Sequence, residues 1–237
     1  NIAVVTGGYS GEANISLRSS AMVMKHMDAD KYNSYKVVIT KDKWVCICNE
    51  KEYPIDKNDF SCMIGKKKLF FDGVFIALHG TPGEDGKIQG YFDMLNIPYT
   101  SCGVAVSALT FNKALTVAAL SHYGIHTAKS IVVNKKDKIS ADEILTKISL
   151  PCFVKPNEGG SSIGTSKVKQ KDELIPAIKK SFKEGNDTII EEFIKGTEIT
   201  CGVISYKGKV KALAVSEIVC KNDFFDYHAK YKDNATE

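Results

Sequence analysis

IAVVTGGYSGE, residues 2–12 of this chain, indicates an α/β fold. Residues 2–5 are apolar and predict a short buried strand, which Gly7 and Gly8 end. Residues 12–27 then show apolar side chains at helical spacing. Because a strand, a glycine turn and a helix follow one another, we expect a βαβ unit with a parallel sheet at the N-terminus.

The alternation of strands and helices continues along the chain. Further strand-like runs occupy residues 35–39, 44–48, 74–78, 131–133, 152–155, 188–193, 198–205 and 210–218. After the strand at 74–78 and a glycine-rich turn, a helical pattern runs to about residue 95. Further helical patterns occupy residues 112–123, 141–147 and 171–183. Pro176 conflicts with its helix and is expected to kink an interior turn. We divide the chain at about residues 100 and 186, where the character of the sequence shifts.

The composition argues against several classes of protein. Of the 237 residues, 43% are hydrophobic and 25% charged, the balance of an ordinary globular protein. The net charge is only +4, and the lysine triplet at 66–68 is typical of a solvated loop, so nucleic acid is not an expected partner. No apolar run approaches the roughly 20 residues that span a membrane. No signal peptide is recognisable, although the chain starts at Asn1 without a methionine.

The seven cysteines point to a reducing compartment. Their number is odd and none forms a CxxC pair, so zinc is not expected. Most lie in apolar, strand-like runs. We therefore expect free, mainly buried thiols and a cytoplasmic protein without a membrane partner.

Two segments follow predicted strands where ligands often bind. Glu12 opens the first helix, where it could complement the helix dipole or reach a ligand beside the glycines. HGTPGEDGKIQG, residues 79–90, holds too many glycines and acids for a simple connector. His79 lies where the carboxyl end of a strand meets a loop, the usual ligand position in α/β sheets. Glu84 and Asp85 could instead cap the next helix.

CFVKPNEGGSSIG, residues 152–164, places a lysine on a strand ahead of a glycine- and serine-rich loop. The loop amides and hydroxyls could hold phosphates, while the ammonium of Lys155 supplies positive charge. The spacing is not that of a P-loop. A flexible hairpin loop is the alternative, but Lys155 lies among apolar strand residues and should need a partner.

Two later segments combine carboxylates, aromatic rings and a short linker. EEFIKGTE, residues 191–198, suits the edge of an adenine and the hydroxyls of a ribose, or else an exposed hairpin. FFDYHAKY, residues 224–231, has neither helical nor strand periodicity and suits a loop that closes over a ligand. A base-stacking segment for nucleic acid would look similar, but the weak net charge is unfavourable to it.

In this order and spacing, the five segments resemble those of D-alanine–D-alanine ligases of the ATP-grasp superfamily. The motifs are GGxSxE after a strand, HGxxGEDGxxQG, KPxxxGSSxG, ExxxxGxE and FxDYxAKY. The resemblance covers essentially the whole chain. It implies an α/β protein with an N-terminal parallel-sheet βαβ domain followed by an ATP-grasp fold of two α+β lobes, the second incomplete. The parts are residues 1–100, the central lobe 101–186, and 187–237 with the closing loop.

The resemblance implies a two-step reaction for peptidoglycan precursor synthesis. ATP phosphorylates the carboxylate of one D-alanine, and the amine of a second D-alanine attacks the acyl phosphate. The residues matched to the catalytic and D-alanine-binding positions are Glu12, His79, Ser161, Lys230 and Tyr231. Those matched to ATP-binding positions are Lys113, Lys155, Ser161, Ser162, Glu191, Phe193, Ile194, Glu198, Phe224, Tyr227 and Lys230.

The chain also departs from the family pattern. His228 stands where glutamate is more frequent, Glu192 where lysine is common, and Asn14 where an acid is usual, and we expect these changes to adjust loops. The family's EINTxPG segment, which carries metal ligands, does not occur. The ligands of Mg²⁺ (or Mn²⁺) are therefore expected beyond Glu237, with none in this chain, and a truncated chain is expected.

For D-alanine–D-alanine ligation, the expected partners are D-alanine and ATP, and the expected assembly is a homodimer. Two alternative functions remain. The first is a ligase that joins D-alanine to D-lactate. Such variants alter the tyrosine matched by Tyr231, whose presence favours an amine as the nucleophile. The second is a truncated, non-catalytic nucleotide-binding remnant, which only the missing C-terminal motif supports.

Overall fold

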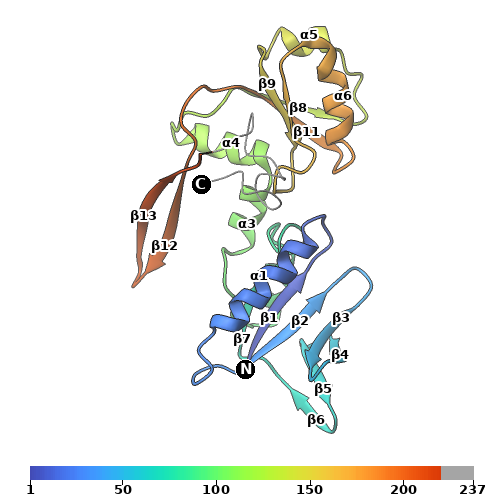
Figure 1. Ribbon diagram of the computed structural model, residues 1–237, viewed down its shortest axis with the longest axis vertical. Helices are drawn as coiled ribbons and strands as arrows, with labels where there is room; N and C mark the ends of the chain where they lie inside the picture. The colour runs from blue at the N-terminus through green and yellow to red at the C-terminus, as the bar shows by residue number, and fades with distance from the viewer. Residues whose placement is uncertain (220–237) are drawn as a thin grey trace. The chain divides into compact units, whose positions relative to one another are not determined.

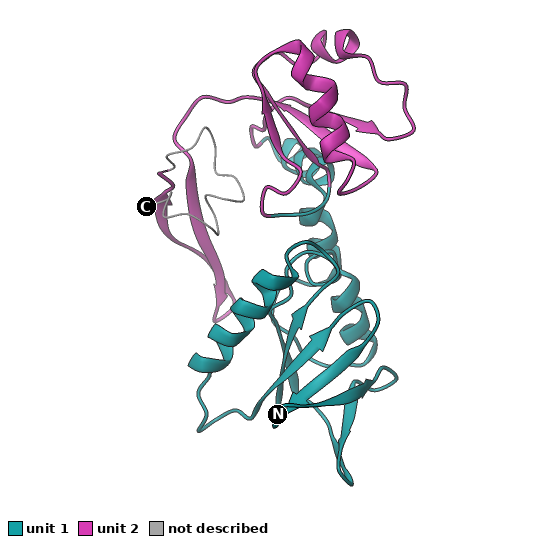
Figure 2. Ribbon diagram, turned by 45° about the vertical axis from the view of Figure 1, so that its right-hand side comes forward, with its two compact units in different colours: residues 1–124, 158–160 teal, residues 125–157, 161–237 magenta. Residues whose placement is uncertain are grey.

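A computed structural model describes residues 1–219 of the chain (Figure 1). The chain forms two compact units (Figure 2). Unit 1 comprises Asn1–Gly124 together with the short piece Glu158–Gly160, and unit 2 comprises Ile125–Asn157 and the residues from Ser161 onward. The three-part division at about residues 100 and 186 stays a prediction.

Unit 1 is built on one seven-stranded sheet in the order β6-β5-β4-β3-β2-β1-β7. The strands are β1 (Ile2–Gly7), β2 (Ser34–Ile39), β3 (Trp44–Cys48), β4 (Lys51–Asp56), β5 (Ser61–Ile64), β6 (Lys67–Leu69) and β7 (Gly73–Ile76). Strand β1 pairs in parallel with both β2 and β7, while β2 to β6 form an antiparallel meander. The expected α/β class and the parallel strands next to β1 are therefore confirmed.

Two helices of unit 1 follow its parallel strands directly. Helix α1 (Ala13–His26) follows β1 and lies against it, and α2 (Lys87–Met94) follows β7 (Figure 1). The core joins Val5 and Ile39 of the sheet to Phe92 of α2, each fully buried. Burial raises the pKa of the Cys46 thiol to about 12, so this cysteine is an inert core residue.

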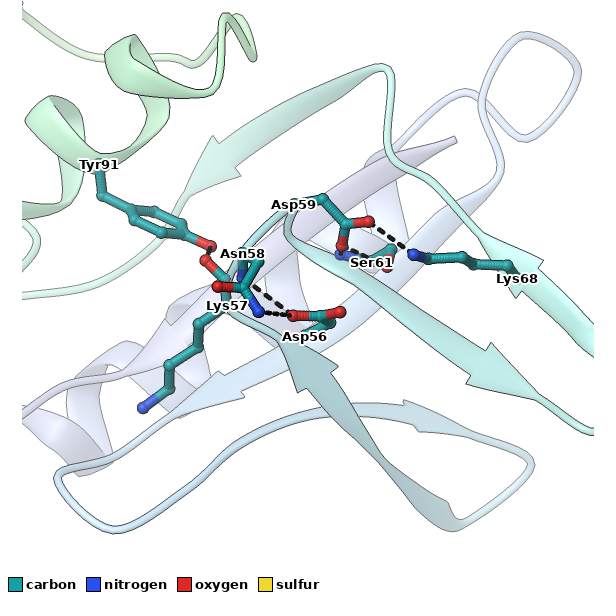
Figure 3. Close-up of polar contacts among 7 residues, drawn as sticks. All are labelled: Asp56, Lys57, Asn58, Asp59, Ser61, Lys68 and Tyr91. Atoms are coloured by element: carbon teal, nitrogen blue, oxygen red, sulfur yellow. Dashed lines mark hydrogen bonds and ion pairs between the residues drawn. The ribbon is translucent and has the colours of Figure 1, made fainter.

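The loop between β4 and β5 is anchored from two sides (Figure 3). The hydroxyl of Tyr91, on α2, donates a hydrogen bond to the carbonyl oxygen of Lys57 at 2.7 Å. Asp59 accepts one from Nζ of Lys68 at 2.6 Å, and this bond holds the pKa of Asp59 below its usual range. Burial, with Asp59 and Asp56 nearby, raises the pKa of Tyr91 to about 12. The meander is thus fixed to the helix that begins after the HGTPGEDG segment.

Helices α3 (Val104–Phe111) and α4 (Lys113–His122) follow in unit 1. The predicted helix over 112–123 is confirmed as α4, whereas α3 was not predicted. No single helix of the described chain has the length and apolar character needed to cross a membrane; α3 and α4 together would reach it but are bent by 105°.

Unit 2 contains an antiparallel four-stranded sheet in the order β10-β9-β11-β8. Its strands are β8 (Ser130–Asn134), β9 (Cys152–Pro156), β10 (Ser166–Val168) and β11 (Asp187–Glu192), and its helices are α5 (Ala141–Leu145) and α6 (Lys171–Ser181). Leu174 and Ile178 of α6 pack with Val154 and Ile190 of the sheet. Helix α6 continues through Pro176, which has no N–H to donate to the helix.

A two-stranded antiparallel hairpin, β12 (Ile199–Tyr206) and β13 (Lys209–Glu217), completes the described chain. Its two-residue turn, Lys207 and Gly208, has positive φ at both positions (50° and 72°), as expected for a tight hairpin turn. The strands predicted over 198–205 and 210–218 are confirmed.

The expected cysteine environment is only partly right. Cys46, Cys62 and Cys152 are buried, but Cys102 and Cys201 are exposed. Cys201 lies in the hairpin, both strands of which are solvent-exposed along their length. An apolar strand sequence therefore does not guarantee a buried thiol.

Candidate active site

Two loops meet at the carboxyl ends of β1 and β7 in unit 1. Because these strands are parallel neighbours, the segments after Gly7 and after Ile76 leave the same edge of the sheet. The backbone N–H of Tyr9 donates to the carbonyl oxygen of Thr81 at 2.9 Å. The structure therefore brings the GGxSxE and HGxxGEDG segments together.

A buried serine that sequence reasoning missed fixes this edge. Oγ of Ser16, on α1, donates to the carbonyl oxygen of Ala77 at 2.7 Å and accepts from the backbone N–H of Gly7 at 2.9 Å. It also lies 3.0 Å from Oγ1 of Thr6, and both side chains are fully buried. One hydroxyl thus joins β1, α1 and the segment after β7.

The carboxylate of Glu12 is buried where the two loops meet, with the residue only 4% exposed. Glu12 is the N-cap residue of α1, but its side chain makes no capping hydrogen bond. Glycines approach it closely: a methyl group on Gly80 would lie 3.0 Å from Oε2, and one on Gly160 would lie 3.0 Å from Oε1. Gly80 also has a φ of +66°, so both conformation and space require glycine there. The expectation that Glu12 complements the start of the helix is therefore not supported by a capping bond, and glycines line both sides of its carboxylate.

His79 and the two acids of the HGTPGEDG segment have separate contacts. Nε2 of His79 lies 3.1 Å from Oγ of Ser19 on α1. Glu84 accepts the backbone N–H of Gly80 at 2.8 Å, which closes the loop on itself. Asp85 accepts the backbone N–H of Lys87, the first residue of α2, at 3.3 Å. The N-cap of α2 is Gly86 and has no side-chain capping bond, so the alternative that Glu84 and Asp85 cap this helix is wrong.

Lys113 lies beside a cavity of unit 1. Its Nζ donates to the carbonyl oxygen of Gly159 at 2.8 Å. The cavity has a volume of about 370 Å³, and its lining includes Lys113, Gly159, Glu84 and Ser107. The wall of this cavity therefore carries the ammonium of Lys113 and the carboxylate of Glu84 beside a glycine-rich loop.

In unit 2, Lys155 forms an ion pair with Glu191. Strand β9 alternates buried and half-buried residues, which puts Lys155 on the outer face, and β11 presents Glu191 on that face from the neighbouring strand. Their side chains are 27% and 13% exposed. The expectation that Lys155 needs a partner is therefore confirmed.

The linker after β11 begins with an aromatic contact. The ring of Phe193 lies 6.1 Å from that of Phe153 between centroids, and Nζ of Lys167 lies 4.2 Å from the Phe193 centroid. The backbone N–H of Phe193 donates to the carbonyl oxygen of Pro151 at 3.2 Å. Ile194 is 62% exposed. The linker thus presents an aromatic face and an apolar side chain to solvent.

Glu192 and Glu198, at the two ends of this linker, differ in how they are held. Glu192 accepts the backbone N–H of Lys129 at 2.8 Å, so this departure from the family pattern secures the start of the β8 segment. The carbonyl oxygen of Glu198 accepts the backbone N–H of Ile218 at 2.9 Å, which closes the hairpin. Glu198 itself is exposed.

The loop after β9 has an unusual backbone. Gly159, Ser161, Ser162 and Gly164 all have positive φ, at 105°, 51°, 58° and 72°. Glycine adopts such angles without strain, but each serine is held in a conformation that costs on the order of 1 kcal/mol or more. Strain of this kind collects at functional segments.

Four predicted site residues, Phe224, Tyr227, Lys230 and Tyr231, lie outside the described residues, as does His228. Within residues 1–219, no group of three or more His, Cys, Asp or Glu side chains could hold a metal ion. The described residues therefore do not fit a metal site, and no chemical step is assigned to a metal here.

Sequence comparison identifies the family. Residues 1–102 match the family model "D-ala D-ala ligase N-terminus", and residues 119–237 match "D-ala D-ala ligase C-terminus". The chain is 52% identical to a D-alanine--D-alanine ligase of Flavobacterium johnsoniae, covering 100% of this chain and 74% of that protein. It is 48% identical to the enzyme of the same name from Parabacteroides distasonis, covering 72% of it.

Solved structures agree in fold. D-alanyl-alanine synthetase A from Vibrio cholerae matches with a TM-score of 0.85 and 26% identity, over 100% of this chain and 72% of that one. The VanG D-Ala:D-Ser ligase from Enterococcus faecalis matches with a TM-score of 0.82 and 30% identity, over 100% of this chain and 74% of that one.

Proposed function

This chain belongs to the D-alanine–D-alanine ligase family, and from that premise we propose that it joins two D-alanines at the expense of ATP. A free carboxylate does not form an amide readily, because its oxygen is a very poor leaving group. Phosphoryl transfer from ATP makes an acyl phosphate, and the amine of the second D-alanine displaces phosphate from it. The dipeptide serves peptidoglycan synthesis.

The observation that carries the proposal is the buried carboxylate of Glu12. It lies at the ligand edge of an α/β sheet, makes no helix-capping bond, and is flanked by Gly80 and Gly160. A buried carboxylate is a suitable partner for the ammonium of the first D-alanine. His79, held beside Ser19, is proposed to contact the same substrate.

The lysines are proposed to bind the phosphates of ATP. Phosphoryl transfer spreads negative charge over the transferred group, and fixed positive charges stabilise it. Lys113 bonds to Gly159 of the glycine- and serine-rich loop, and Lys155 lies on β9, the strand that leads into this loop. Ser161 and Ser162 add hydroxyls, and Lys230 is proposed to reach the transferred phosphate.

The remaining predicted residues take the nucleoside and the attacking amine. Glu191 and Glu198 are proposed to flank the adenine and ribose positions, with the Phe193 and Ile194 backbone between them. A proton acceptor near Ser161 and Tyr231 is proposed to take the proton that the second amine loses, because only the neutral amine attacks. The closing loop, with Phe224 and Tyr227, is proposed to exclude water from the acyl phosphate.

Three further proposals concern the whole protein. Mg²⁺ is proposed to accompany ATP and to neutralise its phosphates. A homodimer is proposed as the assembly, which light scattering of the purified protein would check. The cytoplasm is proposed as the site of action, because the reaction consumes ATP.

The test is phosphate release from ATP by the full-length protein with Mg²⁺. D-Alanine should support release and yield D-alanyl-D-alanine, while L-alanine should not. Glu12→Gln and Lys113→Met should each lose most of the activity, whereas Glu143→Gln, an exposed acid in the first turn of α5, should retain it. ATP binding without release in the presence of D-alanine would contradict ligation of D-alanine and would support the nucleotide-binding remnant.

The second substrate needs its own comparison. One similar structure is that of a D-Ala:D-Ser ligase, and ligases that join D-alanine to D-lactate are an alternative. With limiting D-alanine and added D-serine or D-lactate, the yield of mixed product should be lower than the yield of D-alanyl-D-alanine from D-alanine alone. A preference for D-lactate would replace the proposed nucleophile by a hydroxy acid.

A further inference from the structure

Asn112, at the junction of α3 and α4, uses both ends of its side-chain amide. Its Oδ1 accepts the backbone N–H of Leu115 at 3.0 Å, so Asn112 is the N-cap of α4. Its Nδ2 donates to Oε1 of Glu158 at 3.1 Å. Since only an amide both accepts and donates with fixed geometry, neither aspartate nor serine could make the same pair of bonds.

Glu158 lies at the tip of the glycine- and serine-rich loop, and the tip belongs to unit 1. The residues on both sides of Glu158–Gly160 belong to unit 2. Three successive tip residues contact other residues of unit 1: Glu158 accepts from Asn112, Gly159 accepts from Lys113, and Gly160 lies against the carboxylate of Glu12. The N-terminal end of α4 therefore supplies two adjacent anchors to one loop.

We infer that Asn112 and Glu158 are a positioning pair that fixes the loop tip, Glu158–Gly160, beside Lys113, so that the tip and this lysine bind the ATP phosphates together. The inference rests on the proposed function. Glu158 carries a negative charge, which would repel phosphate, so direct binding of ATP does not explain this residue. A hydrogen bond to a neutral amide holds the loop without adding a second charge at the phosphate site.

The test uses aspartate at position 112 in the full-length protein. Asn112→Asp keeps a good N-cap but replaces the donor by a carboxylate that faces Glu158, so the pair should repel. The dissociation constant of a non-hydrolysable ATP analogue, measured by calorimetry, and the KM for ATP should both rise about tenfold. The KM for D-alanine at saturating ATP and the melting temperature should change little.

Charge reversal distinguishes positioning from a general structural effect. Asn112→Asp with Glu158→Lys restores an attractive pair and should bring nucleotide affinity to within about threefold of the wild type. Asn134→Asp is the matched control: Asn134 also donates to a carboxylate, that of Asp187 at 2.6 Å, and accepts a backbone N–H, that of Lys136 at 3.0 Å. Asn134→Asp should leave nucleotide affinity unchanged, whatever its effect on the melting temperature.

Two results would overturn the inference. One is an unchanged ATP affinity in Asn112→Asp, and the other is a double variant that binds no better than Asn112→Asp alone. A wild-type protein that binds no nucleotide would also overturn it. Nucleotide affinity that follows the expected order, without D-alanine-dependent turnover, would support the positioning pair and contradict only the proposed ligation.

Discussion

Oγ of Ser19 lies 3.1 Å from Nε2 of His79, so helix α1 contacts the imidazole at the edge of the sheet. Ser16 lies three residues earlier on the same helix, and its hydroxyl bonds to the backbone of Gly7 and Ala77. Residues three apart lie on one face of a helix. One face of α1 therefore orders both the backbone and the proposed D-alanine-binding histidine.

Ser19→Ala should loosen the ring of His79 and weaken binding of the first D-alanine. Loss of one hydrogen bond of about 1 kcal/mol predicts a severalfold rise in the KM for that substrate, with the KM for ATP unchanged. Steady-state kinetics with both substrates varied would measure it. Ser20→Ala is the control, because Oγ of Ser20 only donates to Leu17 within the helix. An equal rise in the KM for D-alanine in both variants would show that the contact between Ser19 and His79 does not affect D-alanine binding.

Gly83→Ala should displace the HGTPGEDG loop. A methyl group there would lie 2.3 Å from Cβ of Leu78 and 2.9 Å from its carbonyl oxygen, and Leu78, two residues after β7, is buried in the core. Overpacking predicts a loss of about 1–3 kcal/mol in the free energy of unfolding, together with lower D-alanine affinity. Gly90→Ala, whose methyl would meet Val104 at an ordinary 3.6 Å, should be neutral or stabilising in urea denaturation. A stable Gly83→Ala protein would show that the loop has room to shift.

Tyr91→Phe tests the anchor of the meander through its pH dependence. The raised pKa of about 12 for Tyr91 means that the unfolded phenol ionises first, near pH 10. Its contribution to stability is therefore present below pH 10 and is lost as the pH rises towards 12. At pH 8 the free energy of unfolding of the wild type should exceed that of Tyr91→Phe by about 1 kcal/mol, because of the bond to Lys57. At pH 11 this difference should be smaller. A gap that stays constant between these pH values would contradict the assigned cause.

Local patterns predicted the elements with strong periodicity and missed those with mixed composition. Trp44–Cys48 was predicted at its observed bounds, because its apolar run is short and clearly bounded. Strand β4 (Lys51–Asp56) was missed because charged residues and Pro54 break its pattern, and it forms only by pairing with neighbours. Strands β5, β6 and β10 are three or four residues long, and β6 and β10 contain lysines, so no continuous apolar run marks them.

The candidate site was predicted through residues with distinctive chemistry, not through those that hold them. Glu12 and His79 stand out in their segments, and the structure brings the two segments together. Ser16, Ser19 and Asn112 are common residue types inside or before helices, and only their contacts across the fold distinguish them. The sequence predicted that Lys155 needs a partner, because its neighbours are apolar, but it could not identify Glu191. The pair forms across two strands more than thirty residues apart in the sequence.

Lys155→Met tests the ion pair of unit 2 and the proposed phosphate contact together. It leaves the largely buried carboxylate of Glu191 without a counter-charge, so unfolding should become easier by about 1–3 kcal/mol. Adding Glu191→Leu removes the orphaned charge and should recover part of that loss. Nucleotide binding should be lost in both variants, because neither has the lysine.

Lys171→Met supplies the comparison for that measurement. Lys171 pairs with Asp142 on the surface, their side chains being 55% and 79% exposed, so its loss should change the free energy of unfolding by no more than about 1 kcal/mol. Urea denaturation and calorimetry with an ATP analogue would give both quantities for each variant. Equal destabilisation by the two changes would show that the Lys155–Glu191 pair contributes no more to stability than an exposed surface ion pair. Nucleotide affinity that survives Lys155→Met would exclude this lysine from the phosphate site, whatever its effect on stability.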